Sequence, residues 1–227
     1  MHLDSTRHRV EDVVIEPAGL EGILTLPRGA GAVVLFAHGS GSSRFSPRNR
    51  QVAEALHASG LATLLFDLLM PQETQDRANV FDIDLLARRL VLATEWLTRQ
   101  PAVRVLPIGY FGASTGAAAA LVAAAQRRDI RAVVSRGGRP DMAGASLARV
   151  RAPTLLIVGA EDREVLALNR DAFRQLICEK RLATVPGATH LFEEPGALDA
   201  VIEIAARWFA DHLLSPRGRQ STPGRDG

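Results

Sequence analysis

Short uninterrupted runs of apolar residues alternate along this chain with longer stretches in which apolar residues recur every three or four positions. Runs such as AVVLFA at residues 32–37 are typical of strands buried on both faces of a parallel sheet. The spacing in the longer stretches predicts amphipathic helices. We expect strands at residues 10–15, 20–26, 32–37, 61–66, 131–135, 154–158 and 181–185, and one that begins near residue 105.

Capping and turn residues delimit the expected helices. Ser46 and Pro47 are typical of a first helical turn, and Gly60 ends the helix that they open. Further helices are predicted over residues 82–100, 165–179 and 197–214, with an alanine-rich helix up to about residue 125 and a polar loop over 67–81. Strands that alternate with helices indicate an α/β fold with a mostly parallel sheet, in which residues 10–26 form a hairpin or two neighbouring strands.

The length of 227 residues corresponds to one domain. We expect a flexible N-terminus over residues 1–9, a single domain over 10–214, and a disordered polar tail over 215–227, which is rich in glycine and proline. No internal repeat and no second domain are evident.

Charge and cysteine content exclude several classes of partner. The net charge is only +2, and the basic residues form no stripe interleaved with aromatic residues, so we expect no nucleic-acid binding. The single cysteine, Cys178, cannot form an internal disulfide; we expect it to be a buried thiol in a helix and the protein to be cytoplasmic. The first residues contain no apolar signal sequence, and the longest run of small apolar residues, 117–125, is too short to cross a membrane.

One motif carries a specific chemistry. Gly112-Ala113-Ser114-Thr115-Gly116 lies between an expected strand and an expected helix, which is the context of a nucleophile elbow. The serine of such a turn has a strained backbone, and glycine two positions before and after it removes side chains that would clash. The sequence therefore predicts Ser114 as an exposed nucleophile at the N-terminus of a helix.

A serine hydroxyl needs a base, and His190 is the best candidate because it lies in a short loop between the last strand and the last helix. His38 also follows a strand, where we expect it to shape the next loop. His2 and His8 lie in the N-terminal segment, and His57 and His212 lie in helices.

Asp162 also follows an expected strand and would orient the histidine. Asp141 is the alternative acid, since it follows the preceding strand, whereas we expect Glu161 to face solvent and Asp67 to bind a loop. The order Ser114, Asp162, His190 is that of the triad of α/β hydrolases. Backbone amides of Thr115, Ser40 and Gly41 are the candidates for an oxyanion hole.

The segments FAHGSGSS, GYFGASTGAAAA, LIVGAED and PGATHLF together resemble the dienelactone hydrolase-related branch of the α/β-hydrolase superfamily. The longer segments FAHGSGSSRFSPRN and SRGGRPD are similar to a group of small serine hydrolases, some of which are fused to phosphoribosyltransferase domains. The resemblance covers residues 10–214. It implies an α/β-hydrolase fold with about eight strands, the first two at the edge of the parallel set, and a Ser-Asp-His hydrolase.

The chain departs from dienelactone hydrolases proper, which use a cysteine where this chain has Ser114, so their substrate does not carry over. The connection from 135 to 153 is too short for a cap domain, and we expect an open, shallow pocket. Arg136 and Arg139 follow a strand near the site, and Arg44 lies in the oxyanion-side loop. Arg44 and Arg136 are therefore candidates for binding a substrate anion, or else ordinary surface arginines.

The sequence as a whole predicts a serine hydrolase that cleaves a carboxylic ester, a thioester or a lactone through an acyl-enzyme on Ser114. The alternative is a non-catalytic α/β-hydrolase-fold protein that serves as a binding module. No cluster has the spacing of metal ligands, and neither a metal nor a cofactor is expected. The expected partner is a small-molecule ester, with no nucleic acid and no membrane, and a homodimer is compatible with the chain.

Overall fold

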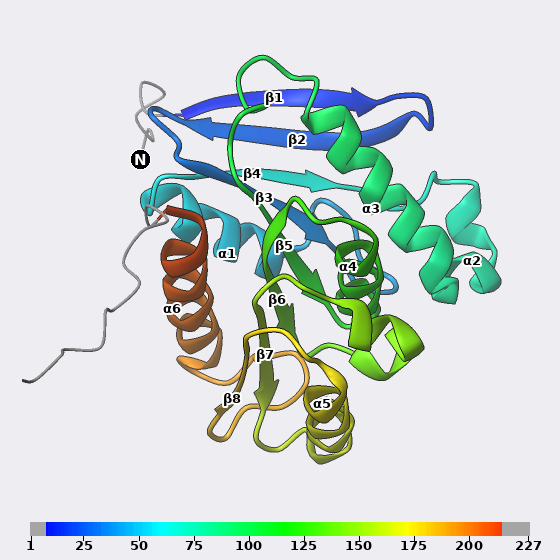
Figure 1. Cartoon of the computed structure of the whole chain (residues 1–227), viewed down its shortest axis with the longest axis vertical. Helices are drawn as coiled ribbons and strands as arrows, with labels where there is room; N and C mark the ends of the chain where they lie inside the picture. Colours follow the sequence, from blue (N-terminus) through cyan, green and yellow to red (C-terminus); the bar gives the residue numbers. More distant parts are fainter. Residues whose placement is uncertain (1–7, 215–227) are drawn as a thin grey trace, which may run out of the picture.

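The computed structural model describes residues 8–214, which form an eight-stranded sheet covered by helices on both faces (Figure 1). The order across the sheet is β1-β2-β4-β3-β5-β6-β7-β8, with β1 and β2 as an antiparallel hairpin at one edge and β3 to β8 parallel. This confirms the predicted sheet. The strands are β1 (His8–Ile15), β2 (Leu20–Pro27), β3 (Ala32–Ala37), β4 (Leu61–Phe66), β5 (Ile108–Ala113), β6 (Ile130–Arg136), β7 (Thr154–Gly159) and β8 (Lys180–Val185).

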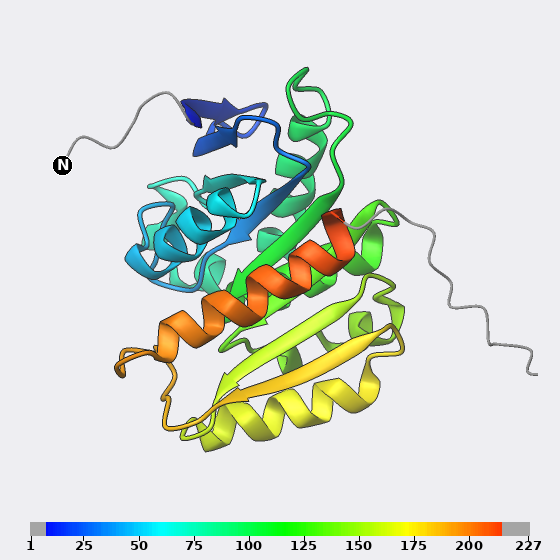
Figure 2. The ribbon, with the colours of Figure 1, turned by 90° about the vertical axis from the view of Figure 1, so that its left-hand side faces the viewer.

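Helices α1 (Pro47–Ala58) and α6 (Ala197–Phe209) cover one face of the sheet, and α3 (Ile83–Leu97), α4 (Thr115–Gln126) and α5 (Arg163–Gln175) cover the other (Figures 1 and 2). A π-helical turn, η3 (Ala210–Leu214), continues α6. Each face holds its own apolar core. Because α4 is enclosed by the sheet, α3 and the segment after β6, almost all of its residues are buried, and its alanines allow this close packing.

Several local predictions differ from the structure. Residues 8 and 9, expected in the flexible N-terminus, pair with Pro27 and Leu26 and extend β1. The predicted helix over 165–179 ends at Gln175 as α5, so Cys178 lies beyond it and is only half-buried. The predictions of flexibility for 1–7 and of disorder for 215–227 concern residues outside those that the structure describes.

Two connections contain short helices that the sequence did not predict. The segment from 67 to 81 holds a 3₁₀ turn, η1 (Glu73–Gln75), and a helix, α2 (Arg77–Phe81), whose first turn is capped by the Asp76 carboxylate. After β6, the chain forms 3₁₀ turns over η2 (Pro140–Arg149). The prediction missed both because neither segment is long enough to show helical periodicity.

The carboxyl ends of the parallel strands lie at one edge of the sheet, where the first turn of α4 packs directly on backbone. A Cβ added to Gly116 would lie 2.2 Å from the carbonyl oxygen of Ala37, and one added to Gly112 would lie 2.4 Å from Ala117 Cα. Both distances are far below van der Waals contact. The two glycines therefore allow strand β3, strand β5 and helix α4 to approach each other as closely as they do.

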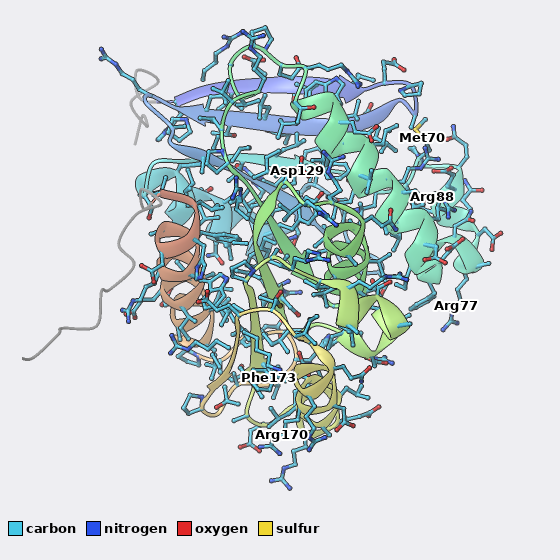
Figure 3. All side chains as sticks on the ribbon, viewed as in Figure 1. Met70, Arg77, Arg88, Asp129, Arg170 and Phe173 are labelled. Atoms are coloured by element: carbon cyan, nitrogen blue, oxygen red, sulfur yellow. The ribbon has the colours of Figure 1, made fainter. Side chains whose placement is uncertain are left out.

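Arginine side chains are distributed over different helices, since Arg77, Arg88 and Arg170 project from α2, α3 and α5 at the surface (Figure 3). Within residues 8–214, no helix is both long and apolar enough to cross a membrane. The same residues include no group of three or more His, Cys, Asp or Glu side chains that could hold a metal ion.

The packing at Gly116 gives a test of stability. Gly116→Ala should lower the free energy of unfolding by about 3 kcal/mol, because the new methyl group overlaps backbone atoms that cannot move independently. The matched control is Gly60→Ala, at a positive φ of 77° with nothing within 4 Å, which should cost only about 1 kcal/mol. Urea unfolding of both variants measures the difference, and equal losses would contradict the steric explanation.

Candidate active site

Ser114 lies between β5 and α4 in a backbone conformation that non-glycine residues rarely adopt, with φ of 52° and ψ of −122°. Its N–H donates to the carbonyl of Arg136 at 3.2 Å, and its own carbonyl accepts from the N–H groups of Arg139 and Ala117, both at 3.1 Å. The side chain makes no capping hydrogen bond to α4. The fold thus fixes the backbone of Ser114 on both sides and leaves its hydroxyl available for another partner.

Asp162 and His190 form a hydrogen-bonded pair. The ring Nδ1 of His190 lies 2.6 Å from Asp162 Oδ2. Since a carboxylate only accepts, Nδ1 is the protonated nitrogen, and Nε2 is left as the basic one. The Asp162 side chain is 14% exposed and that of His190 39%, so the acid is enclosed while the ring borders solvent.

The two loops that carry this pair are joined backbone to backbone. The N–H of Glu161 donates to the carbonyl of Ala188 at 3.0 Å, and Gly159 packs so closely on the same loop that an added Cβ would lie 2.3 Å from that carbonyl oxygen. On the far side of His190, the ring of Phe192 is 2% exposed and anchors the loop in the core. Glu194 accepts hydrogen bonds from the N–H and hydroxyl of Thr189. These contacts hold His190 in place.

Ser114 and His190 both lie next to the peptide that joins Arg136 to Gly137. The Arg136 carbonyl binds the Ser114 N–H, and a Cβ added to Gly137 would lie 3.7 Å from His190 Cε1. Among the described residues, no hydrogen bond joins the Ser114 hydroxyl to the His190 ring. In active sites without substrate, such bonds are often longer than in the reacting complex.

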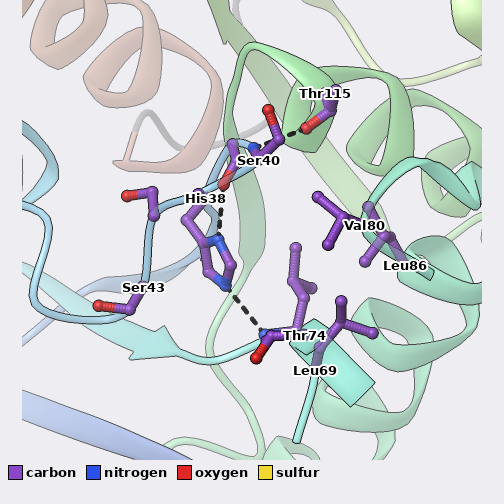
Figure 4. Close-up of a pocket in the computed structure, with 12 residues that line it drawn as sticks. His38, Ser40, Ser43, Leu69, Thr74, Val80, Leu86 and Thr115 are labelled. Atoms are coloured by element: carbon purple, nitrogen blue, oxygen red, sulfur yellow. Dashed lines mark hydrogen bonds between the residues drawn. The ribbon is translucent and has the colours of Figure 1, made fainter. Parts of the chain in front are cut away.

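The three predicted oxyanion residues lie together at the start of α4, but one amide is already engaged. The Ser40 N–H donates to Thr115 Oγ1 at 2.9 Å, which ties the loop after β3 to the first turn of α4 (Figure 4). Within the described part of the chain, the backbone N–H groups of Thr115 and Gly41 have no recorded partner. Thr115 and Gly41 thus remain candidates for the oxyanion hole, whereas the Ser40 amide is bound to the Thr115 hydroxyl.

His38 holds the loop after β3 as the sequence predicted. Its Nδ1 is 3.0 Å from the Gly39 carbonyl, and its Nε2 accepts the N–H of Leu68 at 3.1 Å (Figure 4). The first contact requires a proton on Nδ1 and the second requires a bare Nε2, so the ring is neutral. Loss of hydration lowers the pKa of His38 below its ordinary value, against smaller opposing effects of the Gly39 carbonyl and Asp67.

The other predicted acids have different partners. Asp141, the alternative to Asp162, is bound by both ends of the Arg139 guanidinium at 2.9 and 2.8 Å. Glu161 is exposed, as expected. Asp67 binds the backbone N–H of Arg44 at 2.7 Å, which confirms its predicted role in holding a loop.

Neither arginine that was predicted to bind a substrate anion lies free in the site. The Arg44 guanidinium forms ion pairs with Asp67 and Glu21. Arg136 is the last residue of β6 rather than part of the following loop, and its buried guanidinium contacts Asn49 Oδ1 on α1 at 3.4 Å. Burial, and secondarily the charge of Arg48, lowers the pKa of Arg136 to about 10. Anion binding by Arg44 or Arg136 stays a prediction.

A cavity of about 350 Å³ opens beside the loop after β3 (Figure 4). Residues 38–43 and Thr115 form one wall, and Leu68, Leu69, Val80 and Leu86 form the other. Sequence reasoning missed the second wall because the segment over 67–81 reads as polar. The signal that could have revealed it is the apolar group Leu68-Leu69-Met70 directly after a strand end.

The sheet order, the strained serine after β5 and the loops at the carboxyl edge define the α/β-hydrolase fold. The model of the dienelactone hydrolase family matches residues 20–212. The chain belongs to the dienelactone hydrolase family.

Relatives of high identity support this assignment. The crystal structure of a dienelactone hydrolase from Anabaena variabilis is 56% identical, with a TM-score of 0.88 over 91% of this chain and 99% of that one. A protein of Mycobacterium tuberculosis with the provisional name phosphoribosyl transferase is 60% identical over 205 residues, which are 90% of this chain but 46% of that protein. The chain thus spans about half the length of this curated relative.

More distant structures share the fold alone. Est1E from Butyrivibrio proteoclasticus, solved with ferulic acid bound, is 18% identical, with a TM-score of 0.75 over 89% of this chain and all of that one.

The neutral state of His38 predicts a dependence of stability on pH. The pKa of His38 in the folded protein lies below the value of about 6.5 expected in the unfolded chain. Between these two values only the unfolded chain takes up the proton, so the free energy of unfolding falls as pH drops below about 6.5. The slope from this ring is at most about 1.4 kcal/mol per pH unit.

The measurement compares wild type with His38→Gln, which retains a hydrogen-bond acceptor but does not titrate, by urea unfolding at about pH 7.5 and about pH 5.5. Wild type should lose more stability than the variant over this interval. His57, whose pKa burial lowers to about 4, is present in both proteins and cancels in the comparison. Equal losses would show that His38 is not the group responsible.

Proposed function

We propose that this protein is a serine hydrolase that cleaves a carboxylic ester through an acyl-enzyme on Ser114, with His190 as base and Asp162 as its partner. The observation that carries the proposal is the pairing of His190 Nδ1 with Asp162 at 2.6 Å beside a serine held at φ of 52°. The His190 ring nitrogen Nε2 is then the basic one, and it lies with the Ser114 hydroxyl on either side of the Arg136–Gly137 peptide. Membership of the dienelactone hydrolase family supports a hydrolytic reaction.

The proposed reaction has two stages. His190 Nε2 takes the proton of the Ser114 hydroxyl as its oxygen attacks the ester carbonyl, and the backbone N–H groups of Thr115 and of the loop 39–41 bind the resulting oxyanion. The protonated His190 then gives its proton to the departing alkoxide, which leaves as the alcohol. In the second stage water attacks the acyl-enzyme, with His190 again as base, and the carboxylic acid is released. A thioester or a lactone would follow the same steps.

The phosphoribosyl transferase name belongs to the longer relative, and we do not carry it over to this chain. Residues 20–212 match a hydrolase family, and this chain accounts for 46% of that relative. A non-catalytic binding module is the alternative of a different class. It would have no need for the strained backbone of Ser114, which costs on the order of 1–3 kcal/mol.

The nucleophile assignment is tested with Ser114→Ala. This variant should lose measurable hydrolysis of p-nitrophenyl butyrate and all covalent labelling by a fluorophosphonate, because both require the Ser114 oxygen. The matched control is Ser42→Ala, a serine of the neighbouring loop, which should keep both. Mass spectrometry of the labelled protein locates the modified residue. Labelling that persists in Ser114→Ala would assign the nucleophile elsewhere, and wild type that is never labelled would favour the binding module.

The acid assignment is tested by comparing two isosteric changes. Asp162→Asn should lower kcat by about 10⁴-fold, because an amide in that position no longer favours the histidine tautomer with a proton on Nδ1. Asp141→Asn, whose carboxylate binds Arg139, should lower kcat by less than about tenfold. Steady-state kinetics with one ester substrate measures both. A large loss in Asp141→Asn alone would transfer the role to Asp141.

A further inference from the structure

The cavity of about 350 Å³ lies on one particular side of Ser114. It is lined by the loop after β3, by residues that follow β4 and by Thr115 at the start of α4, and strands β3 and β4 lie on the same side of β5 in the sheet. His190 follows β8, on the opposite side of β5. The nucleophile therefore lies between the cavity and the histidine.

This arrangement decides which part of an ester the cavity can receive. The carbon under attack carries four groups: the Ser114 oxygen, the oxyanion, the leaving oxygen and the acyl chain. The leaving oxygen must lie at His190 to take its proton, and the oxyanion must lie at the Thr115 amide. The fourth group, the acyl chain, is left to extend away from His190, on the side where Ser40 and Thr115 line the cavity.

We infer, on the basis of the proposed function, that this cavity is the acyl-binding subsite and that it selects compact, uncharged, apolar acyl groups. The wall opposite the glycine loop consists of leucine and valine side chains with Thr74 at its edge, and Leu68, Leu69 and Leu86 are at most 5% exposed. Among residues 8–214, no Asp, Glu, Lys or Arg lines the cavity, and the ring of His38 is neutral. An acyl group with a charged end would lose its hydration there without gaining an ion pair.

The volume sets the size of the acyl group. An apolar cavity of about 150 Å³ is enough to bind benzene, so a cavity of about 350 Å³ holds a phenyl ring with a short linker or an acyl chain of medium length. A long fatty-acyl chain would extend into solvent. The alcohol side has no such limit, because the His190 side chain is 39% exposed.

The far wall is held in place by a separate set of contacts. Glu73 accepts the backbone N–H of Met70 at 2.8 Å and pairs with Arg89 of α3 at 2.6 Å. Val80 of α2, on the same segment, points into the cavity, and Thr74 lies at its exposed edge (Figure 4). Both positions can accept a larger side chain without disturbing the sheet.

The experiment uses the whole chain and begins with fluorophosphonate labelling, which counts active Ser114. Two substrate series follow: p-nitrophenyl acetate, butyrate, hexanoate, octanoate and dodecanoate, which vary the acyl group, and methyl, benzyl and naphthyl butyrate, which vary the alcohol. We expect kcat/KM to peak between butyrate and octanoate, to fall by at least about tenfold for dodecanoate, and to vary much less along the alcohol series.

Two variants that fill the cavity, Val80→Phe and Thr74→Phe, should move the peak to acetate and lower kcat/KM for hexanoate at least about tenfold, with acetate nearly unchanged. The control is Val105→Phe, the same change as Val80→Phe at a residue that is 82% exposed and outside the cavity. Thr74 is exposed, so that variant tests the inference even if Val80→Phe fails to fold.

The outcomes separate the two proposals. Labelled enzyme in which both filled variants change the ratios of kcat/KM within the alcohol series, or lower all acyl substrates equally, would overturn the acyl-subsite inference and leave the proposed function intact. Wild type that fluorophosphonate does not label and that hydrolyses no ester would overturn the proposed function, and this inference with it.

Discussion

The first turn of α4 packs against the ends of β3 and β5 with backbone directly on backbone, and the candidate nucleophile and the loop after β3 take their positions from this contact. Gly112 and Gly116 have no side chains to separate the elements, which allows the tight turn at Ser114 between them. The same contact brings Ser40 within 2.9 Å of Thr115 Oγ1. The absence of two Cβ atoms thus allows both the strained turn at Ser114 and the close approach of the loop after β3.

Much of this could be predicted from the sequence because the relevant signals are local. Uninterrupted apolar runs marked the parallel strands, and the glycines around Ser114 marked the turn. Asp162 and His190 could be placed at the same edge because parallel strands end together. The pairing of these two side chains at 2.6 Å agrees with that placement.

What the sequence did not reveal depends on contacts between distant segments. Arg136 looks like a loop residue by composition, yet β6 continues through it and its side chain turns toward Asn49 on α1. Arg44 looks like a free cation until Asp67 and Glu21, more than twenty residues away, are placed beside it. The Ser40 N–H looks available for an oxyanion in the sequence, yet it donates a hydrogen bond to the Thr115 hydroxyl oxygen. Pair interactions of this kind leave no mark in local composition.

The segment that connects β4 to α3 forms one wall of the cavity without forming any strand of the sheet. Its short helix α2 packs against η1 and α3, whereas Ser114, Asp162 and His190 all follow strands. Changes in the length or composition of this connection would therefore leave the geometry of the reacting groups intact. The variable wall of the cavity and the proposed triad thus lie in different segments of the chain, so mutation of a surface connection can reshape the cavity while the strand ends stay as they are.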